Sequence, residues 1–334
     1  MKRIIPVKTS EGFYNIYFSS VENVEKHFDL NRKVMVITDS GVPTEYADAV
    51  LKKAKEGFLF RFSEGEESKN FDTYKEILSS LTENGFSRKD AVVAVGGGVV
   101  GDISGFAAAT YMRGIDFYNV PTTLLSEVDS SIGGKTAIDF GGYKNIVGAF
   151  KAPKGVLIDT ETLKTLPPRQ IGNGMAEAVK MGLTSDKKLF DIFENKNPWE
   201  NIEEIIYRSI LVKKKVVEKD EKEKGLRRIL NFGHTVGHAI EVADGSLYHG
   251  ECVAVGMMVF INKNLRERMK KVLEKLSLPT KTDISPERLL SAIEHDKKKS
   301  GEKISVVVVP EIGAWQIKEM FSEEIISETK EALK

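Results

Sequence analysis

The order of apolar runs along the chain constrains the fold more than any single motif does. In the first half, short runs of β-branched and aromatic residues alternate with stretches of helical period, which predicts a mostly parallel sheet covered by helices. An antiparallel hairpin is expected over residues 3–19, at one edge of that sheet. The expected strands are residues 33–38, 58–62, 91–95 and 117–120, and the expected helices are residues 46–55, 71–84 and 103–112.

Beyond Pro167 and Pro168 the pattern changes to long helical periodicity. We therefore predict two domains: an α/β nucleotide-binding domain over residues 1–155, with a mostly parallel sheet, and a mainly α-helical metal-binding domain over residues 156–334. In the second domain, helices are expected over residues 175–183, 202–219, 235–242, 251–274 and 286–294, and one apolar strand over residues 304–309.

Composition excludes several classes of protein. The 334 residues carry 49 Lys+Arg and 49 Asp+Glu, so no overall field favours nucleic acid or an acidic membrane surface. The basic runs at 213–215 and 297–299 are typical of solvated helix faces. One cysteine, Cys252, excludes a disulfide framework and a four-cysteine zinc site. No apolar run approaches the length of a membrane span and the first residues lack a signal-peptide core, so we expect a cytoplasmic protein.

A glycine-rich loop follows the run at 91–95. Its spacing, Gly96-x-Gly98-x-x-Gly101, matches the dinucleotide-binding fingerprint, in which glycines let a pyrophosphate approach a helix N-terminus. An earlier strand already ends in Asp39, so the loop belongs to a later turn of a variant nucleotide fold; the alternative is a tight turn without a ligand. Gly134-Lys135-Thr136 is no Walker A loop, because that motif needs glycine where Asp129 stands.

Lysine, asparagine and glycine recur between residues 128 and 148, a Gly-rich segment that cannot form a regular helix. Lys135, Lys144, Asn145 and Gly148 would present ammonium and N–H groups to an anion. The plainer alternatives are a helix cap at Asp129 and ordinary surface lysines.

The chain has five histidines, and three of them lie in dense motifs together with Glu177. The motifs are residues 174–180, 230–238 and 248–251. A carboxylate with imidazoles is the ligand set of a catalytic zinc site that keeps an open position. His234 and His238 are four residues apart on one helix face, the spacing of a two-histidine zinc pair. The residues alone leave open whether His238 or His249 completes the set.

Taken in order, these blocks resemble 3-dehydroquinate synthase, a family of the sugar-phosphate cyclases with distant kin among metal-dependent polyol dehydrogenases. The resemblance spans nearly the whole chain; one departure is that the helix after Gly256 reaches Leu278 and Pro279 sooner than is usual. The matching blocks are residues 96–102, 119–126, 128–136, 144–145, 174–180, 220–227, 230–238 and 249–251.

The resemblance implies a lyase of the shikimate pathway, which leads to chorismate and the aromatic amino acids. Such enzymes convert 3-deoxy-D-arabino-heptulosonate 7-phosphate to 3-dehydroquinate and phosphate. Bound NAD⁺ oxidises the C5 hydroxyl transiently and is regenerated in each turnover, and Zn²⁺ or Co²⁺ polarises the C5 oxygen. A homodimer is implied as well, with Arg113 reaching the phosphate site of the neighbouring subunit.

The resemblance also assigns roles to individual residues. Metal ligands are Glu177, His234 and His249, with His238 beside the substrate as a proton acceptor. Phosphate contacts are Lys135, Asn145 and Arg113, and carboxylate contacts are Lys213 and Arg227. Further pocket positions are Asp129, Lys180, Glu223, Asn231 and one of Lys297 and Lys298. NAD contacts are Asp39, Glu66, Lys69, Gly97, Gly98, Asp102, Thr122, Thr123, Lys135 and Lys144.

Three alternatives remain. A sister cyclase would make a cyclitol such as 2-deoxy-scyllo-inosose or an epi-valiolone from a substrate without a carboxylate, which the matches at Lys213 and Arg227 disfavour. A polyol dehydrogenase would release NADH. A catalytically dead metal-binding or NAD-sensing module is disfavoured because every residue type that the chemistry needs is present.

Overall fold

The computed structural model describes residues 3–10, 12–223, 225–297 and 303–333. They form two compact units, Met1–Leu166 and Pro167–Lys334. In the described part of the chain, no helix combines the length and the apolar character needed to cross a membrane.

The first unit is built on a seven-stranded sheet with the order β1-β2-β9-β6-β5-β3-β4. Every neighbouring pair is parallel except β1 and β2, which form an antiparallel hairpin at the edge, so the predicted sheet and its edge hairpin are confirmed. The strands are β1 (Ile4–Thr9), β2 (Gly12–Phe18), β3 (Lys33–Asp39), β4 (Glu56–Phe62), β5 (Ala91–Gly96), β6 (Asp116–Pro121) and β9 (Gly155–Ile158).

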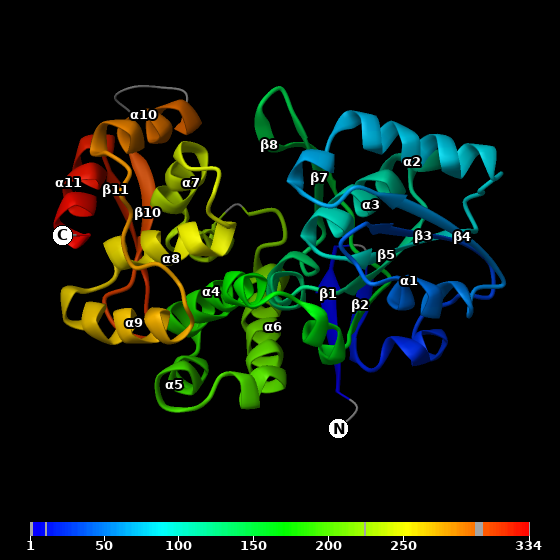
Figure 1. The fold of residues 1–334 in the computed structure, drawn as a ribbon, viewed down its shortest axis with the longest axis horizontal. Coiled ribbons are helices and arrows are strands. Elements are labelled where there is room, and N and C mark those ends of the chain that lie inside the picture. Colours follow the sequence, from blue (N-terminus) through cyan, green and yellow to red (C-terminus); the bar gives the residue numbers. More distant parts are fainter. Residues whose placement is uncertain (1–2, 11, 224, 298–302, 334) are drawn as a thin grey trace. The chain divides into compact units, whose positions relative to one another are not determined.

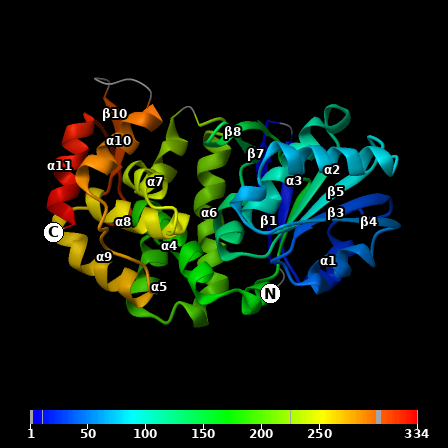
Figure 2. The same ribbon diagram turned by 45° about the horizontal axis from the view of Figure 1, so that its top comes forward.

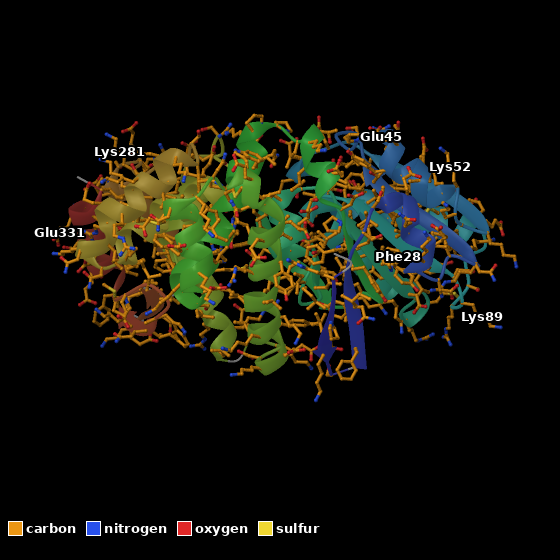
Figure 3. All side chains as sticks on the ribbon, turned by 90° about the horizontal axis from the view of Figure 1, so that it is seen from below. Phe28, Glu45, Lys52, Lys89, Lys281 and Glu331 are labelled. Atoms are coloured by element: carbon orange, nitrogen blue, oxygen red, sulfur yellow. The ribbon has the colours of Figure 1, made fainter. Side chains whose placement is uncertain are left out.

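Helices cover both faces of this sheet, as Figures 1 and 2 show. The central strands are apolar on both sides because each face is buried under helices. One face packs on α1 (Thr44–Leu51) and the turn at Val21–Lys26, and the other packs on α2 (Phe71–Glu83) and α3 (Gly98–Thr110). Charged side chains such as Glu45 and Lys52 at the ends of α1 point away from this core (Figure 3).

The Gly-rich segment that was expected not to form a regular helix contains a second, small sheet. β7 (Lys135–Phe140) pairs antiparallel with β8 (Tyr143–Phe150). Gly141 and Gly142 form the turn with φ of 61° and 82°, which is the left-handed pair that a two-residue hairpin turn requires. The glycines that argued against a regular helix therefore include the two that form the turn of this hairpin.

The second unit is largely helical, as predicted, and Figure 1 shows α7 and α8 lying side by side within it. A two-stranded antiparallel sheet, β10 with β11, was only half expected, since the sequence pointed to one strand there. The elements are α4 (Pro168–Ser185), α5 (Lys187–Asn195), α6 (Ile202–Lys219), α7 (His234–Ala243), α8 (His249–Phe260), α9 (Lys263–Lys275), α10 (Pro286–Lys297), β10 (Ile304–Val308), β11 (Gln316–Met320) and α11 (Ser322–Ala332).

The single helix expected over residues 251–274 is wrong, because the chain breaks between Phe260 and Lys263. Asn262 donates its backbone N–H to Val309 O (2.9 Å), and its side chain accepts from Asn264 N (3.0 Å), which caps α9. Asparagine competes in this way with helical hydrogen bonding. The apolar periodicity continues across the break and so conceals it.

Candidate active site

The three predicted metal ligands come together in the second unit. Glu177 lies on α4, His234 begins α7 and His249 begins α8. Glu177 Oε1 is 3.7 Å from His234 Nε2 and 3.5 Å from His249 Nε2, and one ligand atom from each of the three residues lies within 4.8 Å of the others. One carboxylate and two imidazoles thus face a common point.

Glycines allow the helices that carry these ligands to approach closely. A Cβ on Gly250 would lie 2.1 Å from Asn173 O on α4, and one on Gly256 would lie 1.9 Å from Gly233 O at the start of α7. Gly250 N donates to the side chain of Asn173 (2.6 Å) across the α4–α8 contact. The glycines of the dense motifs are therefore packing residues that set the distances between ligands.

The start of α8 is held from α4 by an ion pair. Arg169 makes a bidentate contact with Glu251, at 2.7 and 2.6 Å, and donates to Ser246 O (2.7 Å) in the loop before the helix. Its guanidinium also stacks 4.2 Å from the Tyr248 ring. Arg169 and Asn173 precede Glu177 by two turns and one turn of α4, so a single helix face holds the start of α8 and supplies the carboxylate.

The site stabilises the charged form of its carboxylate. Burial by itself raises the pKa of Glu177, but the neighbouring Lys180 ammonium and the imidazoles of His249 and His234 lower that pKa well below its usual range. Burial, together with Lys180, lowers the pKa of His234 well below its ordinary value. For His249, burial is outweighed by Glu177 and Glu241, which raise its pKa to about 9.

The donor set fits a divalent cation. Glu177 is fully buried, and among the described residues neither of its oxygens has a well-aligned hydrogen-bond donor, although Lys180 Nζ is in ion-pair contact with Oε2. A buried carboxylate in this state is costly unless a cation completes its surroundings. Carboxylate oxygen with imidazole nitrogen is a ligand set for zinc and for the similar first-row ions.

His238 lies one turn after His234 on α7 and is exposed. Its ring centroid is 5.2 Å from that of His234 and 5.8 Å from that of His249. The described structure groups it with Glu241 and His249 and not with Glu177. The helical histidine pair suggested by spacing therefore does not share the Glu177 carboxylate.

The other predicted pocket residues of the second unit are mostly buried. Lys180 is 1 % exposed, Lys213 5 % and Arg227 3 %, so these cations are placed inside the fold rather than on solvated faces. The expectation that residues 213–215 form a solvated face fails at Lys213, because it faces inward from α6. A buried cation needs a partner inside the fold, and Lys180 has one in the carboxylate of Glu177.

Glu223 and Asn231 also meet: Asn231 Nδ2 donates to Glu223 Oε1 (3.2 Å), and Glu223 has a φ of 57°. They line a pocket of about 370 Å³ together with Arg228 and Lys303, two cations that the sequence reading missed. Lys298 and the side chain of Lys297 lie outside the described part of the chain.

In the first unit, the predicted NAD contacts gather at the carboxyl ends of neighbouring strands, where open α/β sheets bind ligands. Asp39 ends β3, Gly97 caps α3 directly after β5, and Thr122 follows β6. Close packing explains the loop glycines, since a Cβ on Gly97 would lie 3.0 Å from Thr123 and one on Gly98 would lie 3.2 Å from Ser130. Burial raises the pKa of Asp39, and it outweighs the hydrogen bond donated by the backbone N–H of Gly41, which lowers that pKa.

Lys69 joins two other predicted NAD contacts. Its ammonium is 2.8 Å from Glu66 Oε1 and 3.3 Å from Asp102 Oδ2, and the residue is 3 % exposed. Burial lowers the pKa of Lys69, but the charges of Asp102 and Glu66 outweigh it and raise the pKa overall. The three residues therefore form one ionic group beside α3.

The predicted phosphate contacts are spread over the first unit. Lys135 begins β7, opposite Phe150, whereas Asn145 lies near the hairpin turn, roughly 15 Å further along the strands at about 3.3 Å per residue. Asn145 and Arg113 have φ of 55° and 68°, a strained conformation typical of functional positions. Asp129 lies in a π-helical turn, Ser126–Ser130, also frequent at functional sites. The described structure does not bring Lys135 and Asn145 together.

Comparison with known proteins places the chain among enzymes. The families described as "3-dehydroquinate synthase N-terminal" and "3-dehydroquinate synthase C-terminal" match residues 59–173 and 174–299. The chain is 47 % identical to 3-dehydroquinate synthase of Streptococcus thermophilus over 305 residues. The matched region covers 84 % of this chain and 85 % of the relative.

Solved structures of sister cyclases share the fold. A 2-deoxy-scyllo-inosose synthase complexed with carbaglucose-6-phosphate, NAD⁺ and Co²⁺ matches with a TM-score of 0.89 at 29 % identity, covering 99 % of this chain and 100 % of that one. A 2-epi-5-epi-valiolone synthase from Streptomyces hygroscopicus with NAD⁺ and Zn²⁺ matches with a TM-score of 0.86 at 25 % identity, covering 96 % of each chain.

A probable glycerol dehydrogenase from Sinorhizobium meliloti matches with a TM-score of 0.62 at 14 % identity, covering 94 % of each chain, which shows a shared fold alone. The identity to curated relatives over most of the chain, the two matching families and the carboxylate–histidine cluster agree. The chain belongs to the 3-dehydroquinate synthase family.

Proposed function

We propose that this protein is an active 3-dehydroquinate synthase, which eliminates phosphate from 3-deoxy-D-arabino-heptulosonate 7-phosphate and closes the carbocycle of 3-dehydroquinate. The observation that carries the proposal is the cluster of Glu177, His234 and His249, with its buried carboxylate, in a chain of this family. We also propose that NAD is its cofactor. We expect the enzyme to work in the cytoplasm.

Glu177, His234 and His249 would hold Zn²⁺ or Co²⁺, the ions found with two structural neighbours. When bound, such an ion supplies Lewis-acid stabilisation of negative charge on a substrate oxygen. His238, exposed beside the cluster, would accept the proton of the reacting hydroxyl, as an imidazole can near neutral pH. Lys180 holds Glu177 in its ionised form.

Lys213 and Arg227 would bind the substrate carboxylate. Arg227 is buried and is already oriented, since its Nη1 donates to Glu221 O (2.6 Å) and its backbone N–H donates to Asp220 (2.9 Å). A guanidinium held in this way has the planar fork geometry that suits a carboxylate. We place Glu223, Asn231 and one of Lys297 and Lys298 in the same pocket.

NAD would bind at the carboxyl ends of β3, β5 and β6, and it supplies a transient hydride acceptor that is restored within each turnover. Gly97 and Gly98 at the start of α3 would present the helix N-terminus to the pyrophosphate, and Thr122 and Thr123 follow the next strand. Asp39 and the ionic group of Glu66, Lys69 and Asp102 would complete the contacts, together with Lys144.

Lys135 and Asn145 would contact the phosphate, and Asp129 would be a further pocket residue. Because Lys135 and Asn145 lie at opposite ends of the β7–β8 hairpin in this structure, both can reach one phosphate only if the hairpin changes conformation when the substrate binds. We further propose that the working unit is a homodimer in which Arg113 reaches the phosphate site of a second copy. Arg113 is exposed and follows Met112 in a strained turn, so its side chain is directed away from its own core. Light scattering tests this: a dimer supports the proposal, and a fully active monomer contradicts it.

The sister cyclases are the alternative class, and the substrate carboxylate separates the two. We expect phosphate release from the heptulosonate phosphate and none from glucose 6-phosphate, a sugar phosphate without a carboxylate. Arg227→Ala should weaken the first reaction mainly through KM, because a carboxylate contact far from C5 contributes to binding before it contributes to chemistry. Equal turnover of both sugars would favour the cyclitol-forming class.

A further inference from the structure

Glu241, on the last turn of α7, contacts a predicted metal ligand on another helix. Its Oε2 is 3.2 Å from His249 Nδ1. Glu241 is seven positions after His234, so both lie on one face of α7, which packs against α8. The Glu241 side chain is 15 % exposed and that of His249 is 29 % exposed, so water has limited access to the contact.

The two ligand histidines are arranged in the same way. In each, Nε2 faces Glu177 Oε1 and Nδ1 faces an oxygen on the other side of the ring. For His234 that oxygen is the backbone carbonyl of Phe232, at 3.2 Å. A carbonyl can only accept, so the proton of a neutral His234 ring is on Nδ1 and the lone pair of Nε2 is directed at Glu177.

At His249 the oxygen in the corresponding position belongs to the carboxylate of Glu241. We infer that Glu241 is a positioning residue, which accepts the Nδ1–H of His249 and so fixes the tautomer and ring orientation that direct Nε2 at the metal. This inference rests on the proposed ligand set. The contact with Glu241 matters because His249 is the first residue of α8, directly after the loop at 244–248, where the backbone alone holds a ring loosely.

Partners of this kind have measurable effects. Loss of a carboxylate or carbonyl behind a ligating histidine weakens metal binding by about 10–100-fold, because the ring must then be oriented as the ion binds. Glutamine can accept the same hydrogen bond through its side-chain oxygen, whereas alanine cannot. Glu241→Ala and Glu241→Gln therefore separate positioning of the ring from a general effect of substitution on α7.

The experiment is a Zn²⁺ titration of the full chain, stripped of metal, against a chromophoric competitor, with circular dichroism and thermal melting as folding checks. We expect Glu241→Ala to weaken Zn²⁺ binding by about 10–100-fold and Glu241→Gln to restore most of it. Val242→Ala, at the neighbouring position, is the control, since Val242 is 72 % exposed and should leave affinity unchanged.

Co²⁺ replacement gives a second readout, because the visible spectrum of the ion reports the geometry of its ligands. The alanine variant should change that spectrum and the glutamine variant should retain it. Wild-type affinity in a well-folded Glu241→Ala variant overturns the inference alone. Two ions per chain, with the second lost in Glu241→Ala, overturn it in favour of a site made by His238, Glu241 and His249. No binding by the wild type overturns the proposed ligand set and the inference together.

Discussion

Replacing Gly250 by alanine should separate two helices that carry metal ligands. The new Cβ would lie 2.1 Å from Asn173 O and 2.8 Å from Asn173 Oδ1. The first oxygen is part of the backbone of α4, and the second accepts the hydrogen bond from Gly250 N, so neither can move away easily. Ordinary carbon–oxygen contact begins near 3.4 Å, so the start of α8 must move by more than an ångström. His249 is the adjacent residue and would move with it.

The expected cost has two parts. Overpacking of this kind destabilises by about 1–3 kcal/mol, and each kcal/mol lowers the melting temperature by about 2–4 °C in a unit of this size. Metal–ligand distances tolerate only about 0.2 Å, so the shift should also release the ion. We expect Gly250→Ala to melt several degrees lower without metal and to lose zinc on dialysis.

Gly245→Ala is the matched control. Gly245 lies in the loop before α8, a Cβ there would meet no atom within 4 Å, and its φ is not in the left-handed region. This variant should melt and retain zinc like the wild type. If Gly250→Ala also does so, the close α4–α8 contact does not set the ligand geometry and the reasoning fails.

Three further predictions follow from other parts of the molecule. Burial, and to a lesser extent the charge of Asp159, raise the pKa of the fully buried Glu127. Above the ordinary glutamate pKa of 4.5 the unfolded chain loses a proton that the folded chain keeps, so the stability of the fold falls as pH rises. Glu127→Gln removes this loss, so its stability in urea relative to the wild type should improve as the pH rises above 4.5. A difference that does not change with pH would contradict this prediction. His234→Ala and His249→Ala should lose metal on dialysis, whereas His238→Ala should keep it and lose turnover by about 100-fold or more. Elemental analysis of the dialysed variants measures the first effect, and the rate of phosphate release measures the second. Arg113→Ala should raise KM for the phosphorylated substrate in a protein that light scattering shows to be dimeric, and an unchanged KM would remove Arg113 from the phosphate site.

Much of the architecture could be predicted because burial leaves a periodic trace in the sequence. The parallel strands were readable as continuous β-branched runs, and the edge hairpin as an alternating pair. The break between α8 and α9 was not readable, because its cause is the pairing of Asn262 with Val309, a contact between residues far apart in the chain. Hairpin β7–β8 had a signal that was underused, the Gly141–Gly142 pair between alternating residues.

The candidate site was predictable in composition and less so in geometry. Spacing alone favoured His234 with His238, since a helix places residues four apart on one face. The described structure groups His249 with Glu177 instead, because α8 packs across both α4 and α7. Glu241 and Arg169 had no signal of their own in one sequence, because their importance depends on what lies opposite them in the fold.

One measurement tests the central claim most directly. The metal-loaded protein, with a trace of NAD⁺ and excess 3-deoxy-D-arabino-heptulosonate 7-phosphate, should release one phosphate for each molecule of 3-dehydroquinate formed. The amount of product should far exceed the NAD⁺ added, and no NADH should accumulate, because the cofactor is restored in each turnover. NADH formed in step with substrate consumption, without phosphate release, would contradict the account and would place the protein with the dehydrogenases that share its fold.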